Sequence, residues 1–340
     1  MGQPPNYVGA DGTEVICESL RLPAAAQLRR WAACRHKSVI IYDVLTMNIS
    51  VANSEKCIEL KDGRLLGYAE FGSPIGNPIF LFNGSVSRLF YPLDDSVAIA
   101  ANARIITVER PGIGLSTFKP NRTILDWPAD IEELADALGL HHFAVAGGSA
   151  GGPYAAACAF KLPERVTTLA LISSLAPFDI PEISEGMTPL YRMLPAIANY
   201  APWLLTFGQW LIIRNPEGAW KQFYARLPEC DKATLECHPE LNMKTALLND
   251  VVEINRNGVK GGVWDSILLT RPWGFSPAAI TVKTFLWQGE KDLNVPVKMG
   301  QFLAKSVPNC IARFVPNEGH LMYINHWQEI LLALCEQSAV

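Results

Sequence analysis

The feature that most constrains the fold of this chain is an alternation of short apolar runs with helical segments, which begins near residue 57. Near-continuous apolar runs are typical of parallel strands whose two faces are covered by helices. The expected strands span residues 58–60, 65–71, 78–82, 105–108, 143–146, 166–172, 284–287 and 312–315, and the expected helices span residues 127–138, 150–160 and 321–336. The pair Asp62-Gly63 predicts a hairpin between the first two strands. The pattern therefore predicts an α/β fold with a mostly parallel, twisted sheet flanked by helices.

A long interval without strands separates the sixth and seventh expected strands. Residues 177–280 have a helical period that prolines interrupt. We expect this interval to form a helical cap inserted into a core made of residues 51–176 and 281–340. The cap is rich in aromatic side chains, including Tyr191, Tyr200, Trp203, Phe207, Trp210, Trp220 and Phe223. Two interpretations remain open for them: they line an apolar substrate pocket, or they form the core of the cap itself.

The first 50 residues differ from the rest of the chain. Residues 19–42 contain no acid and carry Arg21, Arg29, Arg30, Arg35 and Lys37. A basic targeting helix would have this composition, but we favour a loosely ordered extension or a true start at Met47. Residues 1–23 carry acids where a signal peptide would be basic and then apolar, so we expect no signal peptide.

Charge and composition exclude several classes of function. The chain has 29 basic and 33 acidic residues and a net charge of −4. Binding to phosphate backbones requires a concentrated basic surface, so we expect no nucleic-acid partner. No apolar run approaches the roughly 18 residues that a membrane-spanning helix needs. The eight cysteines form no C-x-x-C pair, which argues against a zinc or dithiol site and favours a reducing, cytoplasmic location.

The sharpest local motif is Gly-Gly-Ser-Ala-Gly-Gly at residues 147–152, placed between an expected strand and an expected helix. A G-x-S-x-G sequence in this context is a nucleophile elbow, in which a strained turn exposes the serine above the sheet. Ser149 is therefore the candidate nucleophile. The alternative is a glycine-rich turn that binds phosphate.

A serine nucleophile needs a histidine base that a carboxylate orients. Among six histidines, His320 follows the last expected strand directly, whereas His141 and His142 precede the strand that leads to Ser149. We predict that His320 is the base. His326 lies inside the closing helix and is expected to be a surface or packing residue.

The candidate acid is Asp292, which follows the seventh expected strand. Glu290 is the rival carboxylate, and a purely turn-forming role for Asp292 is the alternative. The chain order Ser149, Asp292, His320 is the order expected for a nucleophile elbow with its triad partners. All three residues follow strands, so the sequence predicts that they meet at the carboxyl edge of the sheet.

Acyl transfer also requires hydrogen-bond donors for the oxyanion of the tetrahedral intermediate. The backbone amide of Ala150, next to the nucleophile, is the first candidate. The second is the amide of Ser85, in the loop that follows the third expected strand.

These motifs together resemble those of the α/β-hydrolase superfamily, and specifically its capped, serine esterase-like and peptidase-like branch. The resemblance covers residues 57–338 and rests on six segments: residues 61–64, 82–84, 109–116, 147–152 and 289–296, and Gly319-His320. It implies the α/β-hydrolase fold, with a triad of Ser149, Asp292 and His320 and oxyanion donors at Ser85 and Ala150. The family usually has His-Gly after the third strand, whereas this chain has Asn83-Gly84. We expect Asn83 and Gly84 to support the oxyanion loop, because asparagine can bond to neighbouring backbone.

The resulting hypothesis is a serine hydrolase that cleaves an ester, thioester or lactone of a mainly apolar small molecule, with no metal or organic cofactor. A non-hydrolytic lyase or cyclase in the same fold is one alternative, and a catalytically silent ligand-binding protein is another. The natural substrate and the oligomeric state stay open.

Overall fold

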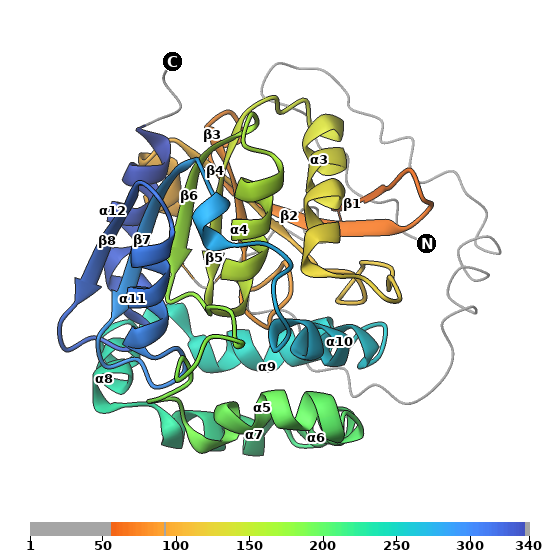
Figure 1. Cartoon of the computed structure of the whole chain (residues 1–340), viewed down its shortest axis with the longest axis vertical. Coiled ribbons are helices and arrows are strands. Elements are labelled where there is room, and N and C mark those ends of the chain that lie inside the picture. The colour runs from red at the N-terminus through yellow and green to blue at the C-terminus, as the bar shows by residue number, and fades with distance from the viewer. Residues whose placement is uncertain (1–55, 92, 337–340) are drawn as a thin grey trace, which may run out of the picture. The chain divides into compact units, whose positions relative to one another are not determined.

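Figure 1 shows a computed structural model of the chain, which describes residues 56–91 and 93–336. The expected extension at residues 1–50, including the proposed start at Met47, lies outside the described residues and stays a prediction.

A single eight-stranded sheet forms the centre of the described part. Its strands are β1 (Lys56–Glu59), β2 (Leu65–Gly72), β3 (Asn77–Phe82), β4 (Ala103–Val108), β5 (Phe143–Gly148), β6 (Val166–Ile172), β7 (Lys283–Gly289) and β8 (Cys310–Val315). They lie in the order β1-β2-β4-β3-β5-β6-β7-β8. The first two pairings, β1 with β2 and β2 with β4, are antiparallel, and all later pairings are parallel. The predicted mostly parallel sheet is confirmed.

The antiparallel end of the sheet begins with the expected hairpin. Gly63 adopts a left-handed backbone with a φ of 80°, which glycine reaches without steric cost. Its amide donates to the carbonyl of Leu60 and closes the turn between β1 and β2. The Asp62-Gly63 pair therefore reverses the chain as predicted.

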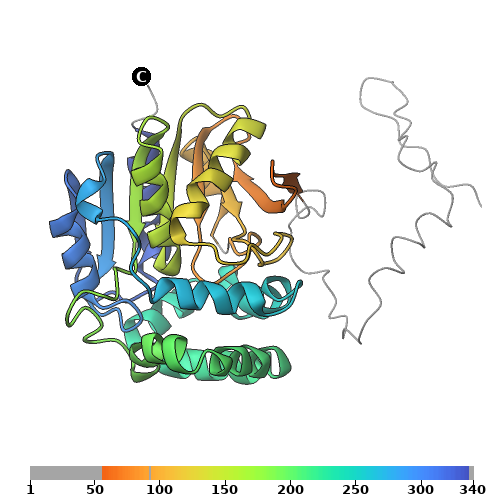
Figure 2. The same ribbon diagram turned by 45° about the vertical axis from the view of Figure 1, so that its right-hand side comes forward.

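Helices cover both faces of the sheet (Figures 1 and 2). Alternate side chains of the strands pack against the helices on opposite faces. Phe80 and Phe82 of β3 belong to a core shared with α3 (Trp127–Ala137), α4 (Gly152–Lys161) and α11 (Val297–Ser306). Ile79 and Leu81 of the same strand belong to a core shared with α2 (Asp95–Ala100) and α12 (Met322–Cys335). Because both faces are covered, the central strands are mainly apolar, which is the pattern that the sequence displays.

Six α-helices lie between β6 and β7, and together they form what is called here the helical insertion. They are α5 (Pro189–Tyr200), α6 (Trp203–Arg214), α7 (Pro216–Arg226), α8 (Glu229–Cys237), α9 (Met243–Ile254) and α10 (Lys260–Leu269). Figures 1 and 2 both show α9 and α10 next to the sheet, with α5, α6 and α7 beyond them. The predicted helical interruption is thus present, and the exact cap boundaries at residues 177 and 280 stay a prediction. Within the described ranges, no helix is both long and apolar enough to cross a bilayer.

Candidate active site

Ser149 occupies a strained turn between β5 and α4. Its φ is 53°, in the left-handed region that non-glycine residues rarely adopt. A Cβ on Gly151 would lie 1.8 Å from the carbonyl oxygen of Phe82, so only glycine allows the turn to approach β3 so closely. Residues 149–151 form a 3₁₀ turn. Helix α4 therefore begins at Gly152, two residues later than the sequence predicted. Strain of this kind is typical of functional sites.

His320 and Asp292 meet at the ends of the last two strands. The Nδ1 atom of His320 lies 2.8 Å from Oδ2 of Asp292. The amides of Asn294 and Val295 each donate to Oδ1 of Asp292 at 2.8 Å. The carboxylate is therefore held in place from both sides, with its second oxygen directed at the imidazole.

The rival residues lie elsewhere. Glu290 is exposed, and so are His141 and His142, which precede β5 at the opposite end from Ser149. His326 lies in α12, with its Nε2 atom 3.1 Å from Glu318 Oε1.

The pKa of His320 is raised above the ordinary histidine value. Burial of the imidazole opposes its protonation, but the charge and hydrogen bond of Asp292 and the charge of Asp231 together outweigh that effect. A positive imidazolium is therefore stabilised at this position, which is the state that forms when the ring accepts a proton.

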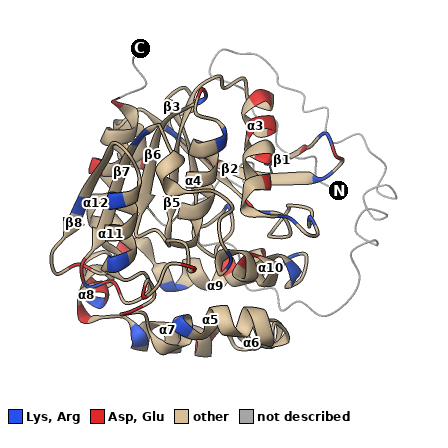
Figure 3. Cartoon of the chain, viewed as in Figure 1, with Lys and Arg blue, Asp and Glu red and all other residues tan. Residues whose placement is uncertain are grey.

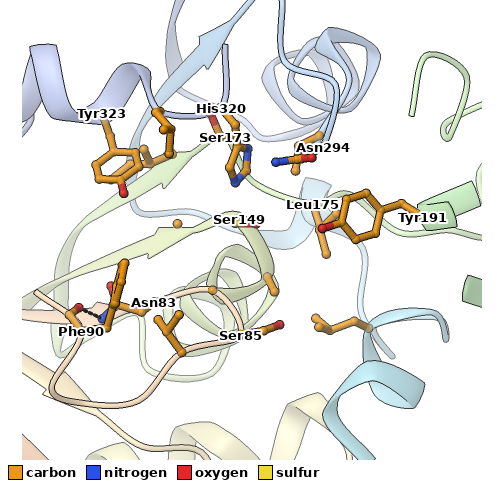
Figure 4. Close-up of a pocket in the computed structure, with 18 of the residues that line it drawn as sticks. Asn83, Ser85, Phe90, Ser149, Ser173, Leu175, Tyr191, Asn294, His320 and Tyr323 are labelled. Carbon is orange, nitrogen blue, oxygen red and sulfur yellow. Dashed lines mark hydrogen bonds between the residues drawn. The ribbon is translucent and has the colours of Figure 1, made fainter. Parts of the chain in front are cut away.

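Ser149 and His320 line the same cavity, and the imidazole of His320 points into it toward Ser149 (Figure 4). Among the hydrogen bonds of the described residues, none joins the Ser149 hydroxyl to His320. Catalytic contacts of this type often tighten only when substrate binds.

The loop after β3 lies directly against Ser149. A Cβ on Gly84 would lie 3.5 Å from Cβ of Ser149 and 3.8 Å from its Oγ. Ser85 follows in this loop and lines the cavity together with Ala150. Ala150 stands in the first turn after β5, where amides have no acceptor within the helix. The side-chain Nδ2 of Asn83 donates to the carbonyl oxygen of Phe90 at 2.7 Å, and this hydrogen bond joins the two ends of the loop.

Arg110 also bonds to the loop after β3. Its Nη1 and Nη2 atoms donate to the carbonyl oxygens of Asn83 and Gly84 at 2.8 and 2.5 Å. Its Nε atom donates to Asp265 of α10 at 2.6 Å. Arg110 and Asp265 are both nearly fully buried. The position of the loop therefore depends on a carboxylate supplied by the helical insertion.

Asp265 is also bonded to the core on its other oxygen. Its Oδ1 atom accepts hydrogen bonds from Arg122 at 2.6 Å and from the hydroxyl of Tyr154 at 2.5 Å. Burial raises the pKa of this carboxyl, but Arg110 and Arg122 outweigh burial and hold the pKa below its usual value. Asp265 is therefore charged and paired with two cations.

Two further buried carboxylates of the insertion bond to loops of the candidate site: one to the loop after β3, and one to the loop that carries His320, called here the histidine loop. Asp250 of α9 accepts from the amide and the hydroxyl of Ser87, two residues beyond Ser85. Asp231 of α8 accepts from the backbone amides of His320 and Leu321 at 3.0 and 2.9 Å. Every buried carboxylate of the helical insertion thus contacts either the loop after β3 or the histidine loop, directly or through Arg110.

Asp250 and its acidic neighbours have unusual pKa values. Burial, together with the nearby charges of Glu109 and Glu253, raises the pKa of Asp250 to about 7. Burial likewise raises the pKa of Glu109 to about 7, although the adjacent Arg88 opposes this shift. The anchoring of the Ser87 loop to α9 therefore involves a carboxyl that titrates near neutrality.

Sequence reasoning missed Arg110, Asp231, Asp250 and Asp265. Asp250 and Asp265 each stand in otherwise mainly apolar helical segments, which could have indicated burial with a partner. The identity of the partners could not have been found this way, because Asp265 and Arg110 are 155 positions apart.

The cavity beside Ser149 has a volume of about 330 Å³. Helix α5 contributes Tyr191 and Leu194 to its wall, and α7 contributes Phe223. No Asp, Glu, Lys or Arg lies among the described residues that line it, and His320 is the only histidine. Neutral, mainly apolar molecules are the ligands that such a wall suits.

The aromatic residues of the insertion follow neither of the two sequence interpretations as a group. Tyr191 and Phe223 line the cavity. Four others, Tyr200, Trp203, Phe207 and Trp210, are more than a third exposed to solvent. Periodicity alone could not separate inward from outward faces, because α6 is apolar on nearly all sides.

Comparison with known families gives one match that covers most of the chain. Residues 81–326 match the family model described as the alpha/beta hydrolase fold. Among curated proteins, the chain is 34% identical over 125 residues to a proline iminopeptidase from Xylella fastidiosa, an alignment that covers 34% of this chain and 37% of the relative. It is 35% identical over 113 residues to the dihydrolipoyllysine-residue acetyltransferase component of an acetoin cleaving system from Pseudomonas putida, covering 33% of this chain and 30% of the relative. The chain thus spans about a third of the length of these relatives.

Solved structures resemble the chain over most of its length. An esterase from Exiguobacterium antarcticum aligns with a TM-score of 0.59 at 18% identity, covering 83% of this chain and 98% of the esterase. An enol-lactonase from Burkholderia xenovorans aligns with a TM-score of 0.60 at 18% identity, with the same coverage. At this identity the likeness concerns the fold.

Proposed function

Because the chain belongs to the α/β-hydrolase family, we propose that it is a serine hydrolase that cleaves an ester, thioester or lactone of a small, neutral, apolar molecule. The observation that carries this proposal is the convergence of Ser149 and the bonded pair His320–Asp292 on one uncharged cavity. The helical insertion serves as the cap that closes this cavity.

In the proposed reaction, the imidazole of His320 accepts the Ser149 proton while Oγ attacks the substrate carbonyl carbon. Asp292 stabilises the imidazolium, and the amides of Ser85 and Ala150 donate to the oxyanion. His320 then gives the proton to the leaving oxygen or sulfur, and an acyl-enzyme remains. Water, deprotonated by His320, attacks the acyl carbon; the imidazolium then returns that proton to Ser149 Oγ as the acyl–oxygen bond breaks, and the acid is released. The chain's own residues supply every proton transfer in this scheme, so the proposal needs no metal or organic cofactor.

The uncharged wall favours esters over the substrates of an aminopeptidase. Recognition of a free amino terminus needs a carboxylate, because a buried ammonium group must be paired. The described residues that line the cavity provide none. We therefore expect hydrolysis of p-nitrophenyl esters and no release of aminocoumarin from prolyl aminocoumarin, and the reverse preference would contradict the ester assignment.

A reducing, cytoplasmic compartment is part of the proposal. The six cysteines in the described part of the chain are all free thiols. Cysteines that remain unpaired are typical of proteins kept in reducing conditions.

The experiment that tests the nucleophile compares two serine variants. Ser149→Ala removes the attacking oxygen and is expected to abolish turnover of p-nitrophenyl butyrate. Ser85→Ala is the matched control, because only the backbone amide of Ser85 has a proposed role, and this variant should keep most of the activity. Retained turnover in Ser149→Ala at an unchanged fold, measured by circular dichroism, would overturn the proposal.

The apolar cavity also predicts a dependence on acyl length. Each buried methylene contributes about 0.8 kcal/mol of transfer free energy, so kcat/KM should rise as the acyl chain lengthens from acetate until the cavity is full. A steady preference for acetate would contradict an apolar acyl site.

A further inference from the structure

The outer helices of the insertion present an extensive apolar surface to solvent. Of the 17 exposed large hydrophobic side chains in the described part of the chain, ten lie on α5 and α6. We call them the α5–α6 face: Leu190, Met193, Tyr200, Trp203, Leu204, Phe207, Trp210, Leu211, Ile212 and Ile213. Monomeric proteins rarely expose contiguous apolar areas of this kind unless the area binds something.

Helix α6 is unusual because none of its 12 residues is buried. A helix that is apolar on nearly all sides normally packs inside a protein or against a membrane. Trp203 and Tyr200 are 66% and 88% exposed. Tryptophan and tyrosine are the side chains enriched where protein meets the interface between bilayer and water.

The charges beside this face are mainly positive. Helices α5 to α7 carry four basic residues, Arg192, Arg214, Lys221 and Arg226, and one acid, Glu217, although the whole chain has a net charge of −4. In Figure 3 the ribbons of α5 and α6 are almost wholly tan, and blue positions lie beside them on α7. An apolar face bordered by basic side chains complements an anionic lipid surface.

We propose that the α5–α6 face docks on the surface of an anionic lipid bilayer, with its aromatic side chains in the interfacial layer and Arg214, Lys221 and Arg226 near the lipid phosphates. Charge argues against two other occupants. A second copy of the chain would bring two basic surfaces together. Residues 19–42 of the same chain carry five basic side chains and no acid, so their charge has the same sign as this surface and would be repelled by it.

Docking would place the bilayer next to the cavity wall. On α5, Tyr191 and Leu194 line the cavity, whereas Leu190 and Met193 belong to the α5–α6 face. One helix therefore separates the apolar face from the site at Ser149. An apolar ester dissolved in the bilayer would reach the site without crossing water; this consequence rests on the proposed function, whereas docking itself does not.

The test is flotation of the full chain with lipid vesicles. We expect binding to phosphatidylcholine vesicles that contain phosphatidylserine, weaker binding to phosphatidylcholine alone, and loss of the difference at high salt. The double variant Trp203→Ser/Phe207→Ser should weaken binding at least tenfold. The control Ile75→Ser/Ile311→Ser changes two exposed apolar residues outside the insertion and should bind as the unaltered chain does.

Two further readouts separate this proposal from the hydrolase proposal. Ser149→Ala should bind vesicles fully, and Trp203→Ser/Phe207→Ser should hydrolyse a short, water-soluble ester at the unaltered rate. No binding to anionic vesicles, or equal binding by the Trp203/Phe207 variant, would overturn the docking proposal and leave the hydrolase proposal intact. A vesicle-independent dimer that the same variant dissociates, seen by sedimentation velocity, would also overturn it and identify a second copy as the occupant.

Discussion

At the scale of single residues, the imidazole of His320 is subject to opposing effects on its pKa. Burial lowers the pKa, and the carboxylates of Asp292 and Asp231 raise it further than burial lowers it. In the proposed reaction His320 must be neutral to accept the serine proton, so we expect activity only at a pH above this raised pKa.

We therefore predict that kcat/KM rises with pH through an acidic limb whose apparent pKa lies above the ordinary histidine value of about 6.5. A pH profile measured with a soluble ester checks this expectation. An acidic limb centred below that value would show that the carboxylates do not control the imidazole.

The carboxyl of Asp250 has a folded-state pKa of about 7, well above the value of an unfolded aspartate. For a group shifted in this direction, the unfolded chain ionises first as the pH rises, so Asp250 lowers the free energy of unfolding between about pH 4 and pH 7. Above that range the loss is complete.

Asp250→Asn cannot ionise, and its side-chain oxygen can still accept from Ser87. We predict that this variant gains stability relative to the unaltered chain at about pH 8 and gains less at about pH 5. Urea unfolding at the two pH values measures the difference. A variant that is equally destabilised at both would mean that the Asp250 carboxylate stabilises the fold in its charged form.

At the scale of elements, buried polar groups join the insertion to the two loops of the candidate site. Asp265 on α10 bonds to Arg110, which donates to the loop after β3, and Asp231 on α8 accepts from the backbone amide of His320. These contacts make the insertion part of the framework that positions the site.

Asp265→Asn should have a large effect, in contrast to Asp250→Asn. The substitution removes the charge that neutralises Arg110 and Arg122, and breaking a buried ion pair costs about 3–5 kcal/mol of stability. Because Arg110 positions the carbonyls of Asn83 and Gly84, we expect kcat to fall by up to about 100-fold with a smaller change in KM. Steady-state kinetics and urea unfolding measure both effects, and an unchanged kcat would show that Arg110 holds the loop without Asp265.

At the scale of the whole molecule, local patterns predicted the strands and the helical interruption but not the sheet order. The expected strand at residues 78–82 differs from β3 by only one residue. The agreement is close because a turn on each side of the apolar run marks where the strand begins and ends. The place of β2 beside β4 arises from pairing between distant segments, which no local pattern contains. Helix α2 has only six residues and was not predicted.

The same distinction holds for the candidate site. Ser149, Asp292 and His320 could be proposed because each follows a strand, and parallel strands end at one edge of a sheet. The contacts of Arg110 with Asn83 and Asp265 depend on how the insertion folds back over that edge, so they could not be read from spacing.

The bonds between insertion and core predict cooperative unfolding. If α8, α9 and α10 detach only when the core unfolds, the proposed hydrolase activity and tryptophan fluorescence should be lost together in one urea transition. A fluorescence change in two steps, with activity lost in the first, would mean that the insertion separates first, because tryptophans lie on both the insertion and the core.

Peptide mapping after reaction with a fluorophosphonate, which bonds covalently to an activated serine oxygen, identifies the nucleophile itself. We predict one adduct, on the peptide that contains Ser149, and greatly slowed labelling in a His320→Ala variant. Labelling of a different serine, or none in a folded chain that hydrolyses esters, would contradict it.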